Sequence, residues 1–335
     1  MTAVWLQFAA CAALIGLAGP VLSRSGDIIA EKTGLSRGWI GLILLATVTS
    51  LPELATGLSA VTVAGAPEIA VGDALGSCVF NLAILIAIDV LRTDASLFRA
   101  ARQGHVLSAG FGIVLIGFVG VTILLGQHGA AWRLGHVSLA TPILVVLYAV
   151  AARTVFAYER AQMEAFAEKI AEQYPHVSLR AATLRYAAAA AVVVAAGVWL
   201  PFVAAELADT MGWRRTFVGT LLVAGVTSLP ELVVALAAVR IGALDMAVAS
   251  LLGSNLFDML ILALDDLAYL EGPLLARVSG VHAVSALSAM IMTGIVVIGL
   301  LYRPQGRLFR AVGWASLALF TVYLLNAYVL FLLGN

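Results

Sequence analysis

The feature that most constrains this chain is a series of long apolar segments that carry very few charges. Only 11% of the 335 residues are charged, and 62% are hydrophobic, whereas about a quarter of the residues of a soluble domain are charged. So few charges cannot cover a surface that faces water. Only helices and closed barrels satisfy their backbone hydrogen bonds in lipid, and these segments are continuous, unlike the alternating strands of a barrel. The sequence therefore predicts an all-α polytopic membrane protein.

The balance of charges and the reactive residues narrow the function. Lys+Arg and Asp+Glu number 19 each, so no net positive field attracts a polyanion, and we expect no nucleic-acid partner. Two cysteines, Cys11 and Cys78, are too few for a disulfide framework or a cysteine metal site. No pair of histidines has metal-ligand spacing, and no nucleophile–base motif or phosphate-binding loop is present. We therefore expect neither an enzyme nor a bound cofactor, and an ion gradient as the energy source.

Ten segments are long enough to cross a bilayer, which requires about 20 mainly apolar residues. They are 3–23, 39–62, 68–91, 105–126, 137–155, 181–206, 217–239, 243–270, 279–301 and 311–333. The first segment has no basic leader region and no clean cleavage site, so we interpret it as a retained span and not as a signal peptide.

The basic residues predict the orientation of these ten spans. Fifteen of the 19 Lys and Arg residues fall on one side, and four fall on the other: Arg133, Arg214, Arg215 and Arg277. Because basic loops stay in the cytoplasm, we expect a multi-pass protein of the plasma (inner) membrane with both termini outside. The polar segment 156–180 is then a cytoplasmic linker between an N-terminal transmembrane repeat, residues 1–155, and a C-terminal transmembrane repeat, residues 181–335.

Two copies of one motif indicate an internal repeat. Val48–Leu54 reads VTSLPEL, and the same seven letters recur 178 residues later at Val226–Leu232. Each half holds five spans, and because five is odd, the second half enters the membrane from the opposite side. Such inverted repeats are common in secondary transporters, whose binding sites lie at the midplane where helices are interrupted. Pro52 and Pro230 each remove a helix hydrogen bond and supply that interruption.

Three carboxylates lie near the middle of predicted spans: Glu53, Glu231 and Asp258. A charge at that depth costs at least ~2.5–3.5 kcal/mol, and no Lys or Arg lies mid-span to compensate it. A cation from solution can do so, and hard cations such as Ca²⁺ and Na⁺ prefer oxygen ligands. The predicted ligand set is Thr49, Ser50, Glu53, Ser77 and Asn81 from the first half, and Thr227, Ser228, Glu231, Ser254 and Asp258 from the second. The alternative is that protonated glutamates only cap the helix breaks and that the small hydroxyl residues only pack helices.

Other acidic residues have more ordinary interpretations. Asp73 either lines an access path or sits where water reaches it. Asp89 and Asp266 lie near span ends, where interfacial placement is simpler than a role in a vestibule. Glu68 and Asp245 stand at span entrances and are expected to be helix-start charges.

The repeated motifs resemble the α-repeats of the cation/Ca²⁺ antiporter superfamily, in particular those of the Na⁺/Ca²⁺ exchanger family in its prokaryotic form. The family pattern is roughly G-T-S-x-P-E followed by G-S-N-x-x-[ND], and the resemblance covers essentially the whole chain. It implies that Glu53 and Glu231 bind Ca²⁺ directly, together with carbonyl oxygens of Thr49 and Thr227. It further implies roles in binding Na⁺ for Ser50, Ser77, Ser228, Ser254 and Asp258, with Asn81 in the same central cluster. The long first helix of each half, spans one and six, would slide across the core.

This chain departs from the family pattern at a few positions. Val48 and Val226 replace the glycine before Thr-Ser, and Cys78 stands where Gly-Ser-Asn is usual. These changes leave the acidic ligands in place and bear on ion selectivity and stoichiometry.

Together these observations predict a secondary active antiporter that exports Ca²⁺ against Na⁺ entry by alternating access, with membrane lipid around it. Ca²⁺ and Na⁺ are then transported substrates and not cofactors. The same carboxylates can also bind protons, so H⁺/Ca²⁺ exchange is the nearest alternative, although the Gly-Asn-x-x-Glu motif of the proton-coupled branch is absent. A cation channel fits a desolvated carboxylate pair between inverted repeats less well.

Overall fold

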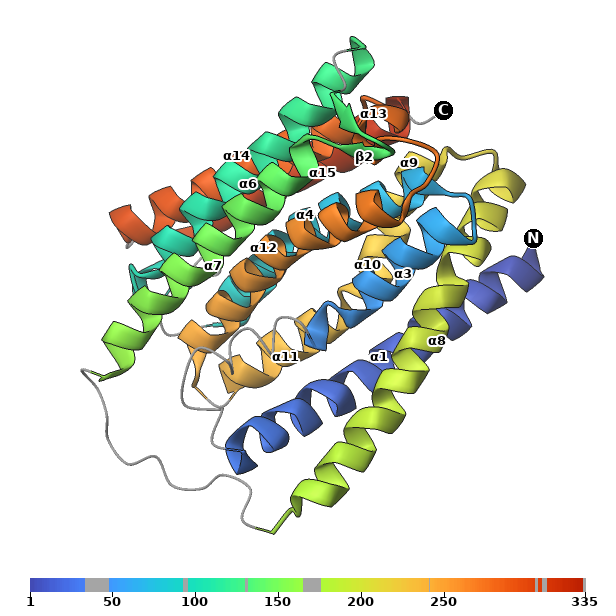
Figure 1. Ribbon diagram of the computed structural model, residues 1–335. Coiled ribbons are helices and arrows are strands. Elements are labelled where there is room, and N and C mark those ends of the chain that lie inside the picture. The colour runs from blue at the N-terminus through green and yellow to red at the C-terminus, as the bar shows by residue number, and fades with distance from the viewer. Residues whose placement is uncertain are drawn as a thin grey trace.

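The computed structural model describes residues 1–33, 48–92, 96–129, 132–164, 176–240, 242–304, 307–308 and 312–333. Nearly all of these residues are helical (Figure 1). The first half contains α1 (Thr2–Lys32), α3 (Leu51–Thr62), α4 (Pro67–Leu91), α5 (Leu97–Ala100), α6 (His105–Gln127), β1 (Arg133–Leu134), β2 (Val137–Ser138) and α7 (Ala140–Glu164). The second half contains α8 (Leu179–Met211), α9 (Arg215–Phe217), the π-helical segment η1 (Val218–Val223), α10 (Ala224–Thr227), α11 (Leu229–Arg240), α12 (Leu244–Ala268), α13 (Leu274–Arg277), α14 (His282–Tyr302), β3 (Arg307–Leu308), β4 (Val312–Gly313) and α15 (Trp314–Leu333). The strands form two antiparallel hairpins, β1–β2 and β3–β4.

The protein is a polytopic all-α membrane protein. Within the described residues, eight helices are long and apolar enough to cross a membrane: α1, α4, α6, α7, α8, α12, α14 and α15. A ninth span is counted if 215–227 and α11, which meet at an angle of 43°, are taken together. The prediction of ten spans is therefore not confirmed. Part of the predicted span 39–62 lies outside the described residues, as do residues 165–175 of the predicted linker.

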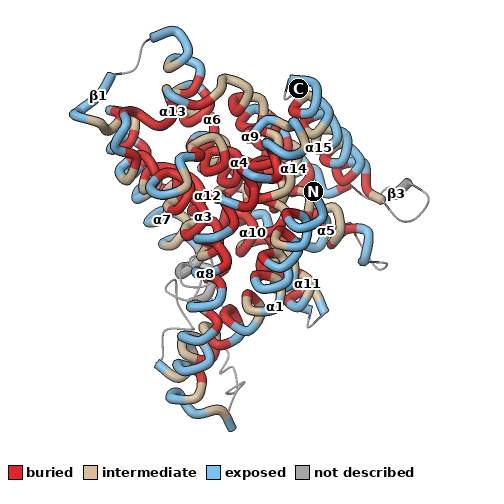
Figure 2. Tube along the Cα trace, turned by 90° about the vertical axis from the view of Figure 1, so that its right-hand side faces the viewer, coloured by how far each residue is buried: buried red, intermediate tan, exposed pale blue. Residues whose placement is uncertain are grey.

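The helices form successive layers (Figure 1). The long helices α1 and α8 lie against each other on one side of the molecule, and α6, α7, α14 and α15 lie on the other. The broken helices α3, α10 and α11 and the central pair α4 and α12 fill the space between them. In the most apolar 18-residue stretches of α4 and α12, 67% and 78% of the residues are buried. The corresponding values are 17% for α7 and 22% for α15. The buried residues consequently gather at the centre (Figure 2), and the apolar faces of the outer helices are left for lipid.

Local sequence explains where the long helices begin and end. The Ser178 hydroxyl accepts a hydrogen bond of 3.2 Å from the Ala181 backbone at the start of α8. Gly212 ends that helix in the left-handed conformation, with φ of 69°, which glycine adopts without a Cβ clash. At 31 and 33 residues and 1.5 Å of rise per residue, α1 and α8 are longer than the roughly 30 Å hydrocarbon layer, so they must tilt or extend beyond it.

The two prolines interrupt helices as predicted. Ser50 precedes α3, with Pro52 in the first turn of that helix. Ser228 separates α10 from α11, and Pro230 lies in the first turn of α11. Because proline lacks an N–H and clashes with the preceding turn, it interrupts a helix at this point. At the second break, α11 is bent by 43° from residues 215–227.

Asp89 and Asp266 are structural anchors, so the vestibule role is not needed to explain them. Asp89 accepts hydrogen bonds from the Leu97 N–H at 2.7 Å, the Gly313 N–H at 3.2 Å and the Ser316 hydroxyl at 2.6 Å. Asp266 accepts hydrogen bonds from the Leu274 N–H at 2.6 Å, the Ser138 N–H at 2.9 Å and the Thr141 hydroxyl. Each carboxylate thus caps a short helix eight residues later in the chain and ties one hairpin to the core.

Glu68 and Asp245 do lie in the first turns of α4 and α12, but each also pairs with a histidine from the other half of the chain. The His282 Nε2 atom lies 2.7 Å from Glu68 Oε2, and the His105 Nε2 atom lies 3.0 Å from Asp245 Oδ1. Glu68 additionally accepts hydrogen bonds from the Ser279 N–H and the Thr216 hydroxyl. These residues therefore join the two halves as well as starting helices.

Candidate cation-binding site

At the two helix breaks, the side chains of two glutamates are buried at the centre of the molecule. Glu53 lies in the first turn of α3 and Glu231 in the first turn of α11. A helix N-terminus carries partial positive charge and unpaired N–H groups, which stabilise a nearby carboxylate. The break and the following Pro-Glu pair therefore act together: proline restarts the helix, and glutamate occupies its positive end.

Hydroxyl groups connect the two breaks. The Ser50 and Ser254 hydroxyls donate to Glu231 Oε1 at 3.3 and 3.5 Å, and the Ser77 hydroxyl donates to Glu53 Oε1 at 3.5 Å. Ser50 belongs to the first break, so its bond to Glu231 crosses between the two halves. Each glutamate is therefore contacted by the serine of the next long helix in its own half, Ser77 on α4 or Ser254 on α12.

The two threonines of the repeated motif also cross between the halves. Thr49 Oγ1 lies 3.4 Å from Ser254 Oγ, and Thr227 Oγ1 lies 3.5 Å from Ser77 Oγ. Each threonine thus meets the serine that contacts the glutamate of the opposite half. Together with the two glutamates, this arrangement brings oxygen atoms from residues 49–50 and from α3, α4, α10, α11 and α12 into one central cluster.

Asn81 and Asp258 lie where α4 crosses α12. The Asn81 Nδ2 group donates to Asn255 Oδ1 at 3.0 Å, and the Asn255 Nδ2 group donates to the Cys78 carbonyl at 3.2 Å. The Cys78 thiol lies 3.6 Å from Asp258 Oδ2. Cys78, where the family pattern has asparagine, therefore contacts an acidic residue of the predicted ligand set.

Several oxygen atoms of this cluster are buried without a partner. All ten predicted ligands are at most 2% exposed. Among the described residues, no hydrogen-bond partner is found for these atoms: Glu53 Oε2, Glu231 Oε2, Asp258 Oδ1, Asn81 Oδ1 and Ser228 Oγ. Burying unpaired polar or charged groups costs several kcal/mol by order of magnitude, unless something compensates them. These unpaired oxygen atoms are therefore candidate ligands for a cation.

Carboxylates alone do not complete such a site. In the part of the chain that the structure describes, no three Asp, Glu, His or Cys side chains come close enough to hold a metal ion. Ca²⁺ takes 6–8 oxygen ligands, and these include carbonyl and hydroxyl groups. The hydroxyls of the central cluster would therefore have to contribute, as the mixed ligand set predicted from the sequence requires.

Two buried residues that adjoin this cluster, Asn255 and Asp73, were not among the ligands predicted from the sequence. Asn255 joins α12 to α4 through its hydrogen bonds with Asn81 and Cys78. Asp73 accepts a 2.8 Å hydrogen bond from the Thr227 hydroxyl and is almost fully buried. The expectation that water reaches Asp73 is therefore wrong. An acidic residue in the interior of an apolar helix was the available signal.

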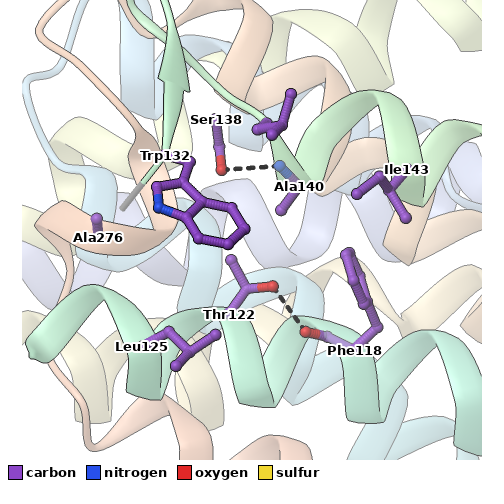
Figure 3. A pocket seen from close by; sticks show the side chains of 9 residues that line it. Phe118, Thr122, Leu125, Trp132, Ser138, Ala140, Ile143 and Ala276 are labelled. Carbon is purple, nitrogen blue, oxygen red and sulfur yellow. Dashed lines mark hydrogen bonds between the residues drawn. The ribbon is translucent and has the colours of Figure 1, made fainter. Parts of the chain in front are cut away.

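One surface pocket lies apart from this cluster (Figure 3). It lies between α6, α7 and the hairpin that precedes α7. Its lining is mainly apolar: Phe118, Thr122, Leu125, Trp132, Ser138, Leu139, Ala140, Ile143 and Ala276. Its hydroxyls already bond locally, as Thr122 does to the Phe118 carbonyl at 2.8 Å. The pocket contains none of the ten predicted ligands.

Comparisons with known proteins identify the family. A family model described as sodium/calcium exchanger protein matches residues 3–156 and 182–329. An uncharacterized membrane protein of Methanocaldococcus jannaschii is 27% identical over 231 residues, which are 69% of this chain and 70% of that protein. The H⁺/Ca²⁺ exchanger CAX has the same fold, with a TM-score of 0.71 at 16% identity over 98% of this chain and 86% of that one. The sodium-calcium exchanger NCX_Mj has a TM-score of 0.60 at 22% identity over 96% of each chain. This chain belongs to the sodium/calcium exchanger protein family, a family of membrane transporters.

Proposed function

We propose that this protein is a secondary active antiporter that exchanges Ca²⁺ for Na⁺ by alternating access. The observation that carries the proposal is the pair of buried glutamates, Glu53 and Glu231, at two matching helix breaks. Each glutamate keeps one oxygen without a partner among the described residues. The hydroxyls around them come from both halves of the chain, so movement of one half against the other changes the ligand shell.

The chemistry of the ligands suits both ions. Two carboxylates compensate the charge of one Ca²⁺, and hard cations prefer the carboxylate and hydroxyl oxygens of this cluster. Na⁺ competes for the same oxygens. An empty cluster leaves bare carboxylates in a low-dielectric interior, which is costly. The protein therefore changes the side to which the site is open more readily when the site holds an ion than when it is empty. This difference couples the flux of Ca²⁺ to the flux of Na⁺. The ligand set is the ten residues predicted from the sequence.

The proposed architecture is ten transmembrane helices in two inverted five-helix repeats, residues 1–155 and 181–335. The ends of α1 and α15 that carry the chain termini lie on the same side of the molecule, opposite the end of α7 and the start of α8 (Figure 1). This arrangement supports external termini and a cytoplasmic linker, 156–180, in the inner membrane. The antiparallel contact of α1 with α8 supports a moving pair of long helices.

The close contacts of α1 and α8 support the same motion. A Cβ atom at Gly19 of α1 would lie 2.8 Å from Pro230 Cβ, and one at Gly197 of α8 would lie 2.9 Å from Ala55 Cβ. Each long helix therefore places a glycine against the broken helix of the other half. Sliding of α1 and α8 along these glycine faces would open the central cluster to alternate sides.

Proton-coupled Ca²⁺ exchange is the second candidate. It is favoured by the buried carboxylates beyond the two glutamates, Asp73, Asp258 and Asp265, which can all carry protons. An H⁺/Ca²⁺ exchanger shares this fold, so the fold is compatible with either coupling ion. A channel remains the less favoured alternative, because the cluster is buried and not a continuous row of exposed sites.

The test is radiocalcium uptake by proteoliposomes under an imposed Na⁺ gradient or an imposed pH gradient. We expect uptake driven by internal Na⁺, its loss in Glu53→Gln and Glu231→Gln, and normal uptake in Glu206→Gln, which alters an exposed glutamate. Uptake driven only by pH would replace Na⁺ by H⁺ in the proposal. Full exchange by the Glu53→Gln/Glu231→Gln double variant would refute the site.

A further inference from the structure

Besides the anchors Asp89 and Asp266, two buried carboxylates of the described residues lie outside the ten predicted ligands, Asp73 on α4 and Asp265 on α12. They are 1% and 0% exposed. Asp73 Oδ2 and both oxygens of Asp265 have no hydrogen-bond partner among the described residues. No described Lys, Arg or His forms an ion pair with either carboxylate. The negative charges of Asp73 and Asp266 both act on Asp265, so its charge is not compensated by its neighbours.

Both carboxylates are displaced from the central cluster in the same direction. Asp73 precedes Ser77 by one turn of α4, toward the start of that helix at Pro67. The carboxylate of Asp265 packs directly against Gly57, which follows Glu53 by one turn of α3. Residues 63–66 join the end of α3 to the start of α4. Asp73 and Asp265 therefore both lie between the central cluster and the side of the molecule on which the chain termini lie.

Gly57 makes room for the carboxylate of Asp265. A Cβ atom at position 57 would overlap both carboxylate oxygens of Asp265, and it would lie 2.9 Å from Asp265 Cγ. The space beside α3 is thus shaped for this side chain. Asp265 is held in the interior next to α3 with both oxygens unpaired, and it does not turn away to the surface.

The other half of the chain has no such pair. The motif offset of 177 residues that relates Ser77 to Ser254 also relates Asp73 to Ser250 and Asp265 to Ile88. A serine and an isoleucine carry no charge. The two extra carboxylates therefore distinguish the terminal side of the molecule from the linker side.

We propose that Asp73 and Asp265 form an additional binding position for a monovalent cation, beside the central cluster on its terminal side. The ligands are the free oxygens of the two carboxylates, and the Thr227 hydroxyl lies within reach because it already contacts Asp73. A monovalent ion suits the position, because the free oxygens of the two carboxylates and the Thr227 hydroxyl are fewer than the 6–8 oxygen ligands that Ca²⁺ takes. The position goes beyond the Ca²⁺/Na⁺ exchange proposed above, since the mirrored ligands alone do not require it.

The test is equilibrium binding of ²²Na⁺ and ⁴⁵Ca²⁺ to the purified full-length protein in detergent. We expect the wild type to bind one more Na⁺ per molecule than Asp265→Asn, and than Asp73→Ser, which installs the residue of the other half. Both variants should still bind Ca²⁺, which also reports that they are folded. Asp209→Asn alters an exposed carboxylate paired with Arg215 and should bind as many Na⁺ ions as the wild type.

A further variant separates the position of Asp265 from its charge. Gly57→Ala keeps both carboxylates but displaces Asp265, and we expect it to lose the same Na⁺ ion. Equal Na⁺ counts in the wild type, Asp265→Asn and Asp73→Ser would overturn the proposal, including the case in which these carboxylates hold only protons. The result is independent of the exchange proposal, because Glu53→Gln should lose Ca²⁺ and retain the Na⁺ that depends on Asp265.

Discussion

The contact between α8 and α3 yields a prediction that can be worked out from geometry. In Gly197→Ala, the new Cβ would lie 2.9 Å from Ala55 Cβ and 3.2 Å from the Pro52 carbonyl oxygen, against 3.4–4 Å for ordinary contact. Both neighbours are rigid, so α8 must move away from α3. Overpacking of this kind destabilises by about 1–3 kcal/mol. Replacing a helical glycine by alanine stabilises the helix by about 0.5–1 kcal/mol. The net cost is therefore up to about 2.5 kcal/mol, or roughly 60-fold in an equilibrium constant.

This cost should appear in transport and not in binding. The clash lies between a long helix and a broken helix, so it changes the balance between the arrangements of α8 and leaves the ligand oxygens in place. We expect Gly197→Ala to lower the rate of radiocalcium exchange in proteoliposomes by about eightfold, which corresponds to ~1.25 kcal/mol, the middle of the range from zero to this upper limit. Its Ca²⁺ affinity in detergent should stay within about threefold, or ~0.7 kcal/mol. Gly19→Ala, which meets the rigid ring of Pro230, should behave in the same way.

Two controls make the reasoning refutable. Gly110→Ala and Gly294→Ala place a Cβ in open space within spanning helices, so they report the effect of helix propensity alone and should transport normally. Ala55→Gly added to Gly197→Ala removes the atom that the new Cβ meets and should restore part of the rate. If Gly197→Ala transports as well as Gly110→Ala, the contact does not limit the motion, and the sliding interpretation is wrong.

Three further predictions concern stability and orientation. Asp89→Asn and Asp266→Asn should each lower thermal stability in detergent while leaving Ca²⁺ affinity unchanged, because hydrogen bonds to a charged group are worth about 1.5–3 kcal/mol each; a variant with normal stability and weak Ca²⁺ binding would contradict the anchoring role. A double-mutant cycle on the Glu68–His282 pair should give a coupling of more than about 1 kcal/mol, since His282 is fully buried and an exposed pair would give less than that; near-zero coupling would exclude a contribution from this contact. Arg133→Cys should react with a membrane-impermeant thiol reagent from outside intact cells, and labelling only after lysis would reverse the proposed orientation.

The repeated motif shows how far local sequence could predict the site. The Pro-Glu pairs were recognisable from the sequence. A proline that breaks a helix and a carboxylate within a long apolar segment each cost free energy, so both are unusual in a membrane span. Their effect is local, and the structure confirms the two breaks at Ser50 and Ser228. The roles of Asp89 and Asp266 were not recognisable in the same way, because their donors lie up to 227 and 128 residues away.

Asp73 illustrates the same limit for the cation site. In the sequence it is one acidic residue in α4 without an acidic counterpart, and its surroundings depend on which helix packs against it. The contact with Thr227 joins residues 154 positions apart. Only the packing of α10 on α4 places this carboxylate beside the central cluster.

The sequence by itself determined that this protein lies in a membrane, that its helices break at two prolines and that glutamates follow the breaks. These properties arise from residue composition and from backbone chemistry within a single turn, so they do not depend on distant residues. Only the tertiary structure decided that each threonine meets the serine of the other half, that α1 and α8 rest on the opposite breaks, and that Asp73 and Asp265 lie on one side. Such pairings follow from the way whole helices fit together, because a contact forms only where the shapes of two distant helices allow close approach.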